Sequence, residues 1–136
     1  HPSRVIFGHA KGIMADESLM TRLLKRGAYL QFDTLGYSEA LARSRLGAAD
    51  DFAVAQAIVK LVQAGYGNQV LLSQDVCTKL QLKKYGGRGY SYVMEFFLPE
   101  LKRLGLTDEQ IHRLMVENPR RILAFIAPVQ RGRPTP

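Results

Sequence analysis

Three side chains that can bind a metal ion or accept a proton each follow a short apolar run in this sequence. His9 follows residues 4–8, Asp33 follows residues 28–32, and Asp75 ends the stretch 68–75. Histidine and aspartate are common zinc ligands, and a carboxylate beside a metal can take a proton from bound water. The residue types alone leave a second interpretation open, in which His9 is hydrogen-bonded within a loop and Asp75 caps a turn.

The run before Asp75 predicts a strand that is buried on both of its faces. Val70, Leu71 and Leu72 are consecutive apolar residues and therefore cannot alternate between core and solvent. Strands of this kind belong to parallel sheets whose two faces are covered by helices. Ligands bind at the carboxyl ends of such strands, and side chains from successive strand ends can converge there on one ion.

Helical patterns separate the three runs. Asp16 can cap a helix that ends at Gly27, and Asp50 or Asp51 can cap a second helix that ends at Gly65. The resulting order, β-α-β-α-β, is the unit that builds parallel sheets with right-handed crossovers. The polar stretch 37–49 is expected to form a loop or an irregular helix.

A long basic and glycine-rich connection, residues 76–89, follows Asp75, and a loop of this length is more often functional than idle. Further helices are predicted from Ser91, from the capping box at 107–110 and from Asn118. The apolar residues expected to pack in the first and last of these helices are Tyr92, Phe96, Phe97, Leu101, Leu104, Ile122, Leu123 and Phe125.

The composition indicates one globular domain, since 136 residues with 46% hydrophobic residues can form a core. The formal net charge is +7, but the basic residues are spread along the chain at expected helix ends, so we predict no nucleic-acid binding. No apolar run approaches the roughly 20 residues that span a bilayer, and no signal pattern opens the sequence, so we expect no membrane contact. The single cysteine, Cys77, excludes an internal disulfide, and we expect a cytoplasmic protein.

Several motifs, in the right order, resemble the carboxy-terminal part of phosphotriesterase-family proteins, close to the phosphotriesterase-homology and phosphotriesterase-related branch of the amidohydrolase superfamily. The motifs are His1-Pro2-Ser3-Arg4-Val5 with Gly8-His9, Gly27-Ala28-Tyr29-Leu30-Gln31-Phe32-Asp33-Thr34-Leu35-Gly36, Leu71-Leu72-Ser73-Gln74-Asp75, Leu82-Lys83-Lys84-Tyr85-Gly86-Gly87-Arg88-Gly89-Tyr90 and Glu117-Asn118-Pro119-Arg120-Arg121-Ile122-Leu123. The resemblance covers residues 1–126, and residues 127–136 are expected to form a flexible tail.

The fold of this family is a (β/α)8 TIM barrel with a binuclear metal centre, often zinc, at the carboxyl ends of the strands. The resemblance implies that residues 5–8, 29–32 and 70–73 are strands six, seven and eight. The chain would then be an α/β protein that forms a partial TIM barrel, with the last three β/α units followed by carboxy-terminal helices.

The resemblance also assigns roles to individual residues. His9 matches the metal-binding histidine after strand six. Asp75 matches the catalytic aspartate after strand eight, which binds metal and takes a proton from the bridging hydroxide. Asp33 matches a residue after strand seven that supports a metal ligand without binding the metal. The loop that shapes the substrate pocket is matched by residues 77–90, including Cys77, Tyr85, Arg88 and Tyr90.

The sequence departs from the family pattern in two ways. The family usually carries an acidic residue just after the histidine, where this chain has Ala10-Lys11-Gly12. The His-X-His pair of strand one, the bridging carboxylated lysine or glutamate of strand four and the histidine of strand five belong to parts of the barrel upstream of residue 1. The chain therefore offers only two of the expected metal ligands.

Two functions follow as hypotheses. The first is a hydrolase of the phosphotriesterase family that uses zinc or another divalent metal to cleave a small-molecule ester, lactone or phosphotriester, with this chain supplying part of the site and inactive alone. The second is a non-catalytic partial-barrel module that self-associates. A complete barrel takes about 250 residues, so we expect a fragment that needs the missing amino-terminal barrel half, or a homo-oligomer.

Overall fold

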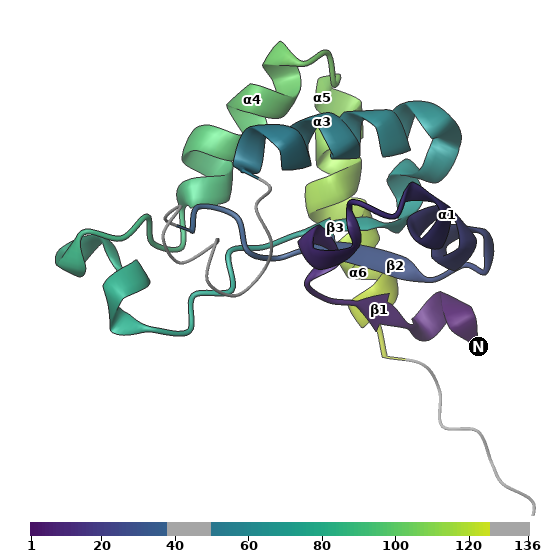
Figure 1. Cartoon of the computed structure of the whole chain (residues 1–136), viewed down its shortest axis with the longest axis horizontal. Helices are drawn as coiled ribbons and strands as arrows, with labels where there is room; N and C mark the ends of the chain where they lie inside the picture. Colours follow the sequence, from purple (N-terminus) through teal and green to yellow (C-terminus); the bar gives the residue numbers. More distant parts are fainter. Residues whose placement is uncertain (38–49, 126–136) are drawn as a thin grey trace, which may run out of the picture.

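The computed structural model describes residues 1–37 and 50–125, and its strands form one parallel sheet (Figure 1). The strands β1 (Ile6–Phe7), β2 (Tyr29–Phe32) and β3 (Val70–Leu72) lie in the order β1-β2-β3. The parallel α/β arrangement predicted from the apolar runs is confirmed. Most of the predicted loop, 38–49, and the predicted tail, 127–136, lie outside the described residues.

The helices that connect and follow the strands begin largely where the sequence predicts. Asp16 caps α1 by accepting a hydrogen bond from the Leu19 N–H at 2.8 Å, and Asp50 caps α3 through the Ala53 N–H at 2.7 Å. No helix in the described ranges has the length and apolar character needed to cross a membrane. The α-helices are α1 (Glu17–Lys25), α3 (Asp51–Leu61), α4 (Leu98–Arg103), α5 (Asp108–His112) and α6 (Asn118–Leu123). The π-helical segments are η3 (Val62–Tyr66), η7 (Val93–Phe97) and η8 (Arg113–Glu117), and the 3-10 segments are η1 (Pro2–Arg4), η2 (Ala10–Ile13), η4 (Gly67–Gln69), η5 (Lys79–Gln81) and η6 (Lys83–Tyr85).

The main core lies between one face of the sheet and the helices. Leu30 pairs with Val70 in the sheet, and both side chains are fully buried in the same cluster as residues of α1, α3 and η7. Successive side chains of a strand point to opposite faces. Tyr29 and Leu71 therefore face the other side, where they form a second, smaller cluster with Ile122. Since Val70 and Leu71 are both buried, the prediction of a strand buried on two faces is confirmed.

Helix α6 crosses the strands in the view of Figure 1, and its Ile122 packs with Tyr29 and Leu71. The Asn118 side chain, which is fully buried, donates hydrogen bonds to the carbonyl oxygens of Gly67 at 2.7 Å and Val70 at 2.8 Å, just before and at the start of β3. Beside β1, Arg4 donates to two carbonyl oxygens at the end of the helix, each at 3.2 Å. These bonds fix the end of the sheet that lies opposite Asp75.

Some aromatic and aliphatic residues expected in the core are exposed. Leu123 and Phe125 are exposed to solvent. Asn118 and Ile122 form the buried side of α6, and the backbone becomes extended at Ala124, where the helix ends. Phe96 is also half exposed, because Val93 and Phe97 supply the buried face of η7. The expectation that Leu123, Phe125 and Phe96 pack inside was therefore wrong.

Candidate functional site

His9 and Asp75 share an uncommon backbone conformation at the carboxyl ends of β1 and β3. Their φ angles are 53° for His9 and 48° for Asp75, and no other non-glycine residue of the described ranges has a positive φ. The left-handed region is disfavoured for residues with a Cβ atom, and such strain concentrates at functional sites. The two residues predicted to bind metal are therefore also the two with a left-handed backbone.

Asp33, at the end of β2, holds His9 through both its backbone and its ring. The His9 N–H lies 3.1 Å from each carboxylate oxygen of Asp33, and His9 Nδ1 lies 2.9 Å from Asp33 Oδ1. A Cβ at Gly8 would come within 3.2 Å of Asp33 Oδ2, so the small residue before the histidine leaves room for this contact. The Asp33 side chain is nearly buried while that of His9 is 55% exposed. With Nδ1–H donating to Asp33, the imidazole keeps Nε2 as its acceptor atom.

Asp75, at the end of the β3 strand, is held by Tyr37 and Gln81. The Tyr37 hydroxyl is a donor shared by two oxygens of Asp75, the carbonyl oxygen at 2.7 Å and Oδ2 at 3.1 Å. The carbonyl oxygen also accepts a hydrogen bond from Gln81 Nε2 at 3.0 Å. Burial raises the pKa of the Tyr37 hydroxyl, and the neighbouring Cys77 thiol and the Asp75 carboxylate raise it further. Tyr37 therefore remains a hydrogen-bond donor to Asp75 at neutral pH.

A buried ion pair joins Lys11 of η2 to Asp51 at the start of α3. Lys11 Nζ, in a side chain that is 3% exposed, is 3.5 Å from Asp51 Oδ1. Asp51 Oδ2 accepts hydrogen bonds from the Gly36 N–H at 2.7 Å and from the Tyr92 hydroxyl at 2.9 Å. Burial and the Asp51 carboxylate raise the pKa of Tyr92 to about 12. Lys11 lies in the stretch just after His9, where the family pattern has an acidic residue. It belongs to a network that links the segments after β1 and β2 to α3 and to Tyr92, just before η7.

The long loop after Asp75 exposes the residues that the resemblance placed around the substrate. Tyr90 is 69% exposed, and its carbonyl oxygen accepts a hydrogen bond from Gln74. Tyr85 is half exposed, with ammonium groups of two lysines within 6 Å of its ring, and the Arg88 guanidinium lies over the rings of Tyr92 and Phe96. Cys77 is exposed, and its N–H donates to Gln81 Oε1 at 2.9 Å. In Figure 1 this loop extends away from the sheet beyond β3.

The structure thus places two candidate metal ligands at the strand ends. His9 is hydrogen-bonded to Asp33, and Asp75 is hydrogen-bonded to Tyr37. Across residues 1–37 and 50–125, no three histidine, cysteine or acidic side chains gather as a metal site would require. Tyr37 and Gln81 were missed in the sequence as supports of Asp75. Tyr37 lies 38 positions before Asp75, and no local pattern signals a contact over that distance.

The phosphotriesterase family model matches residues 2–123 of this chain. The chain belongs to the phosphotriesterase family. The family predicted from the motifs is thereby confirmed. An N-acetyltaurine hydrolase from Dictyostelium discoideum is 33% identical over 126 residues, covering 91% of this chain and 34% of that protein. Another from Salmo salar is 30% identical over 128 residues, covering 90% of this chain and 36% of that protein.

Two solved structures superpose closely on the chain. A resiniferatoxin-binding protein from Rhodobacter sphaeroides matches with a TM-score of 0.83 and 38% identity, covering 90% of this chain and 34% of that one. The phosphotriesterase homology protein from Escherichia coli, complexed with phosphate in its active site, matches with a TM-score of 0.79 and 30% identity, covering 90% of this chain and 39% of that one. This family member therefore spans little more than a third of the length of the relatives it matches.

Proposed function

We propose that this chain supplies one part of the active site of a metal-dependent hydrolase, as the last three β/α units of a (β/α)8 barrel. The observation that carries the proposal is the pair of left-handed residues, His9 and Asp75, at the carboxyl ends of two parallel strands. This is the end of a parallel sheet at which ligands bind. The bond from Asp33 to His9 Nδ1 is the kind of support that metal-binding histidines receive.

The donor atoms of the two residues fit a divalent metal such as zinc in type but fall short in number. His9 would offer Nε2, and Asp75 would offer Oδ1, since Nδ1 and Oδ2 are engaged by Asp33 and Tyr37. A catalytic zinc needs about three protein ligands, so the other ligands would come from the part of the barrel that this chain does not contain. A bound metal would polarise the scissile bond and lower the pKa of a coordinated water.

The residues of this chain would then orient the two metal ligands and accept a proton. Asp33 fixes the ring of His9, and Tyr37 with Gln81 fixes the carboxylate and the backbone of Asp75. The Asp75 carboxylate would accept the proton of the attacking water as a general base. The Tyr37 hydroxyl, 3.1 Å from Oδ2 of Asp75, would fix the orientation of the carboxylate during this transfer.

Names of the relatives support a small-molecule substrate with an acyl or phosphoryl centre. The similar proteins include N-acetyltaurine hydrolases, a phosphotriesterase from Mycobacterium tuberculosis and a lactonase from Deinococcus radiodurans. The bonds named are an amide, a phosphotriester and a lactone, which widens the predicted ester, lactone or phosphotriester class to N-acyl amides. Water attacks an electrophilic carbon or phosphorus in each case.

The test uses the complete enzyme that has this chain as its last third. Asp75→Asn is expected to lower kcat by about a hundredfold to ten-thousandfold, as the loss of a general base does. Asp33→Asn is expected to lower zinc affinity by about tenfold to a hundredfold, because the His9 ring loses its carboxylate support. Asp16→Asn, which changes a carboxylate of the same type at the cap of α1, is the matched control and should leave both quantities unchanged.

Metal content measured beside activity separates the roles of the residues. The 136-residue chain alone is expected to hold zinc weakly, because it offers two donors. Hydrolysis that survives Asp75→Asn within tenfold, in a protein with normal zinc content, would refute the assigned proton acceptor.

A further inference from the structure

One carboxylate, that of Asp51 at the start of α3, contacts groups from three segments that each follow a strand. Lys11, whose Nζ lies 3.5 Å from Asp51 Oδ1, belongs to η2 after β1. Gly36, whose N–H donates to Asp51 Oδ2 at 2.7 Å, lies in the turn after β2. Tyr92, whose hydroxyl donates to the same oxygen at 2.9 Å, follows the long loop after β3. The Asp51 side chain therefore joins the segments that leave all three strands.

Asp51 is not needed as the cap of α3, although it is the first residue of the helix. The cap is Asp50, whose side chain accepts a hydrogen bond from the Ala53 N–H at 2.7 Å. An aspartate in the first turn also interacts favourably with the helix dipole, but it can do so from solvent. The Asp51 side chain is instead only 20% exposed, and the Lys11 side chain beside it is 3% exposed. Removing one partner of a buried ion pair is strongly unfavourable, so this contact is a fixed part of the fold.

The turn after β2 is held by the core and by the Asp51 network together. Leu35 is 2% exposed and packs in the main core. Gly36 has a φ of 80°, and a Cβ at this position would lie 2.6 Å from the ring of Tyr92. The turn therefore runs directly against the ring whose hydroxyl Asp51 accepts, at a place that only glycine fits. These contacts fix the backbone immediately before Tyr37.

Tyr37 connects this turn to Asp75. Its hydroxyl lies 2.7 Å from the carbonyl oxygen and 3.1 Å from Oδ2 of Asp75. A tyrosine side chain is rigid apart from two torsion angles, so a shift of the backbone at Gly36 moves the Tyr37 hydroxyl with it. The left-handed backbone of Asp75 is unfavourable by itself and persists only where surrounding contacts hold it. The orientation of Asp75 therefore depends on where the turn after β2 lies.

We propose that Asp51 is a positioning residue for Asp75. It fixes the turn after β2 through the Gly36 N–H and thereby sets where the Tyr37 hydroxyl meets the Asp75 carboxylate. The proposal rests on the proposed function, in which Asp75 accepts the proton of the attacking water. A misplacement of about 1 Å at a reacting group can lower a rate by about a hundredfold, so a residue outside the reaction can control kcat in this way.

The test compares two variants that differ in one group. Both carry Lys11→Met, which removes the lysine that would otherwise stay buried without its carboxylate. Asp51→Ala deletes the acceptor of the Gly36 N–H, whereas Asp51→Asn retains a side-chain oxygen at the same position. The difference between the two variants therefore reports on the bond to the turn and not on the loss of the ion pair.

The first measurement needs no substrate and uses the 136-residue chain. Hydrogen exchange of the Gly36 amide, followed by NMR, is expected to be about tenfold to a hundredfold faster in the Asp51→Ala variant, as the loss of one hydrogen bond to a charged acceptor provides. The Asp51→Asn variant should exchange at a rate close to that of the original chain. Equal exchange rates in the two variants would show that Asp51 does not hold the turn, and the proposal would be wrong.

The second measurement is a double-mutant cycle in the complete enzyme that has this chain as its last third. In the Lys11→Met background, Asp51→Ala is expected to lower kcat about tenfold to a hundredfold with KM nearly unchanged, because it displaces the proton acceptor and not the substrate. Asp51→Asn should restore most of this loss. Tyr37→Phe should lower kcat at least as much as Asp51→Ala, and adding Asp51→Ala to it should cause no further loss, because Asp51 acts through the Tyr37 hydroxyl.

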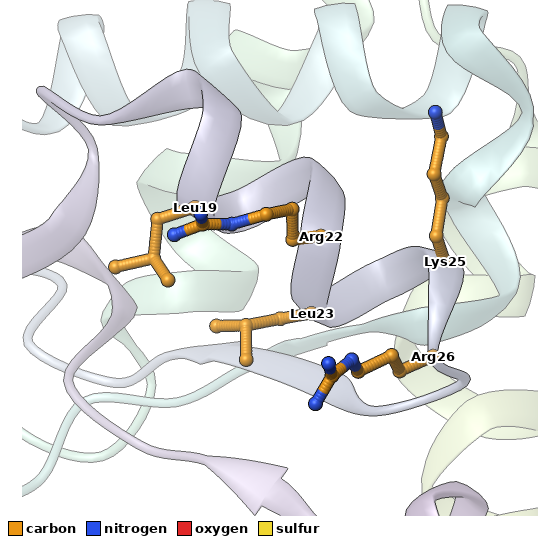
Figure 2. Close-up of a pocket in the computed structure, with 5 residues that line it drawn as sticks. All are labelled: Leu19, Arg22, Leu23, Lys25 and Arg26. Atoms are coloured by element: carbon orange, nitrogen blue, oxygen red, sulfur yellow. The ribbon is translucent and has the colours of Figure 1, made fainter.

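Two controls show whether the effect is specific to the turn. Asp50→Ala removes the cap of α3 and weakens the same end of the helix, and it is expected to leave kcat and the exchange rate of the Gly36 amide close to their original values. Arg22→Ala changes an exposed side chain of α1 and should change neither quantity. Arg22 lies in an open hollow of about 500 Å³ that shares no residue with the Asp51 network (Figure 2). The hollow is lined by Leu19, Arg22, Leu23, Lys25 and Arg26.

Two kinetic results would overturn the proposal. Losses of kcat that multiply when Asp51→Ala and Tyr37→Phe are combined would mean that the two residues act independently. A loss in Asp50→Ala as large as that in Asp51→Ala would mean that weakening of α3 explains both. Hydrolysis that survives Asp75→Asn refutes the proposed function instead, and it leaves the exchange rate of the Gly36 amide as a separate result.

Discussion

Replacing Asn118 by alanine tests how α6 holds the sheet that positions Asp75. The Asn118 side chain is fully buried and bridges two carbonyl oxygens, those of Gly67 at 2.7 Å and Val70 at 2.8 Å. Alanine removes both donors and leaves the two acceptors without these bonds. The change therefore acts at the amino-terminal end of β3, opposite the candidate site.

The expected cost follows from these two bonds. A typical hydrogen bond contributes about 1 kcal/mol net, and a buried acceptor left without a partner costs about 1–3 kcal/mol. Two such acceptors give a loss of roughly 2–6 kcal/mol in the free energy of unfolding. This is a large part of the roughly 5–15 kcal/mol that stabilises a domain. With a urea m-value of about 2 kcal/mol/M, the midpoint should fall by about 1–3 M.

Urea unfolding followed by circular dichroism measures the effect, and two further variants decide its origin. Asn118→Asp keeps the size of the side chain but removes the amide donors, so it should destabilise at least as much as alanine at neutral pH. Arg121→Ala removes an exposed bond of 3.3 Å to the Asn68 carbonyl oxygen and should change stability by less than about 0.5 kcal/mol. If Asn118→Asp retains the stability of the original chain, the two hydrogen bonds are not what holds α6.

Two further predictions concern the segments around the site. Burial and Asp51 raise the pKa of Tyr92 from 10.0 to about 12, so its stabilising contribution is complete below pH 10 and is lost as pH rises toward 12. Tyr92→Phe should remove this part of the alkaline loss of stability, and an unchanged pH profile of unfolding would contradict the assignment. A Cβ at Gly87 would lie 2.2–2.4 Å from backbone atoms of Gln81, so Gly87→Ala should displace the loop after β3 and speed its cleavage by trypsin. Gly12→Ala, where a Cβ meets no atom within 4 Å, serves as the control and should be cleaved at the original rate.

The sequence determined the local elements and the family. Three apolar runs predicted three parallel strands, because burial patterns depend on neighbouring residues. Asp16 predicted the start of α1, and the pair Asp50 and Asp51 predicted the start of α3, of which the structure selects Asp50 as the cap. The motifs predicted the phosphotriesterase family, which the match over residues 2–123 confirmed. The sequence also placed His9 and Asp75 at strand ends. Their roles in catalysis stay predictions.

Only the tertiary structure decided which side chains meet. The bond between His9 and Asp33 joins residues 24 positions apart, and the bond between Tyr37 and Asp75 spans 38 positions. Such contacts depend on how strands and helices pack, which no local pattern encodes. The same reason explains Phe96, whose spacing suited the core but whose helix turned Val93 and Phe97 inward instead. The exposure of Phe7 is a further tertiary result, since Phe7 pairs with the fully buried Leu30 but is itself 39% exposed.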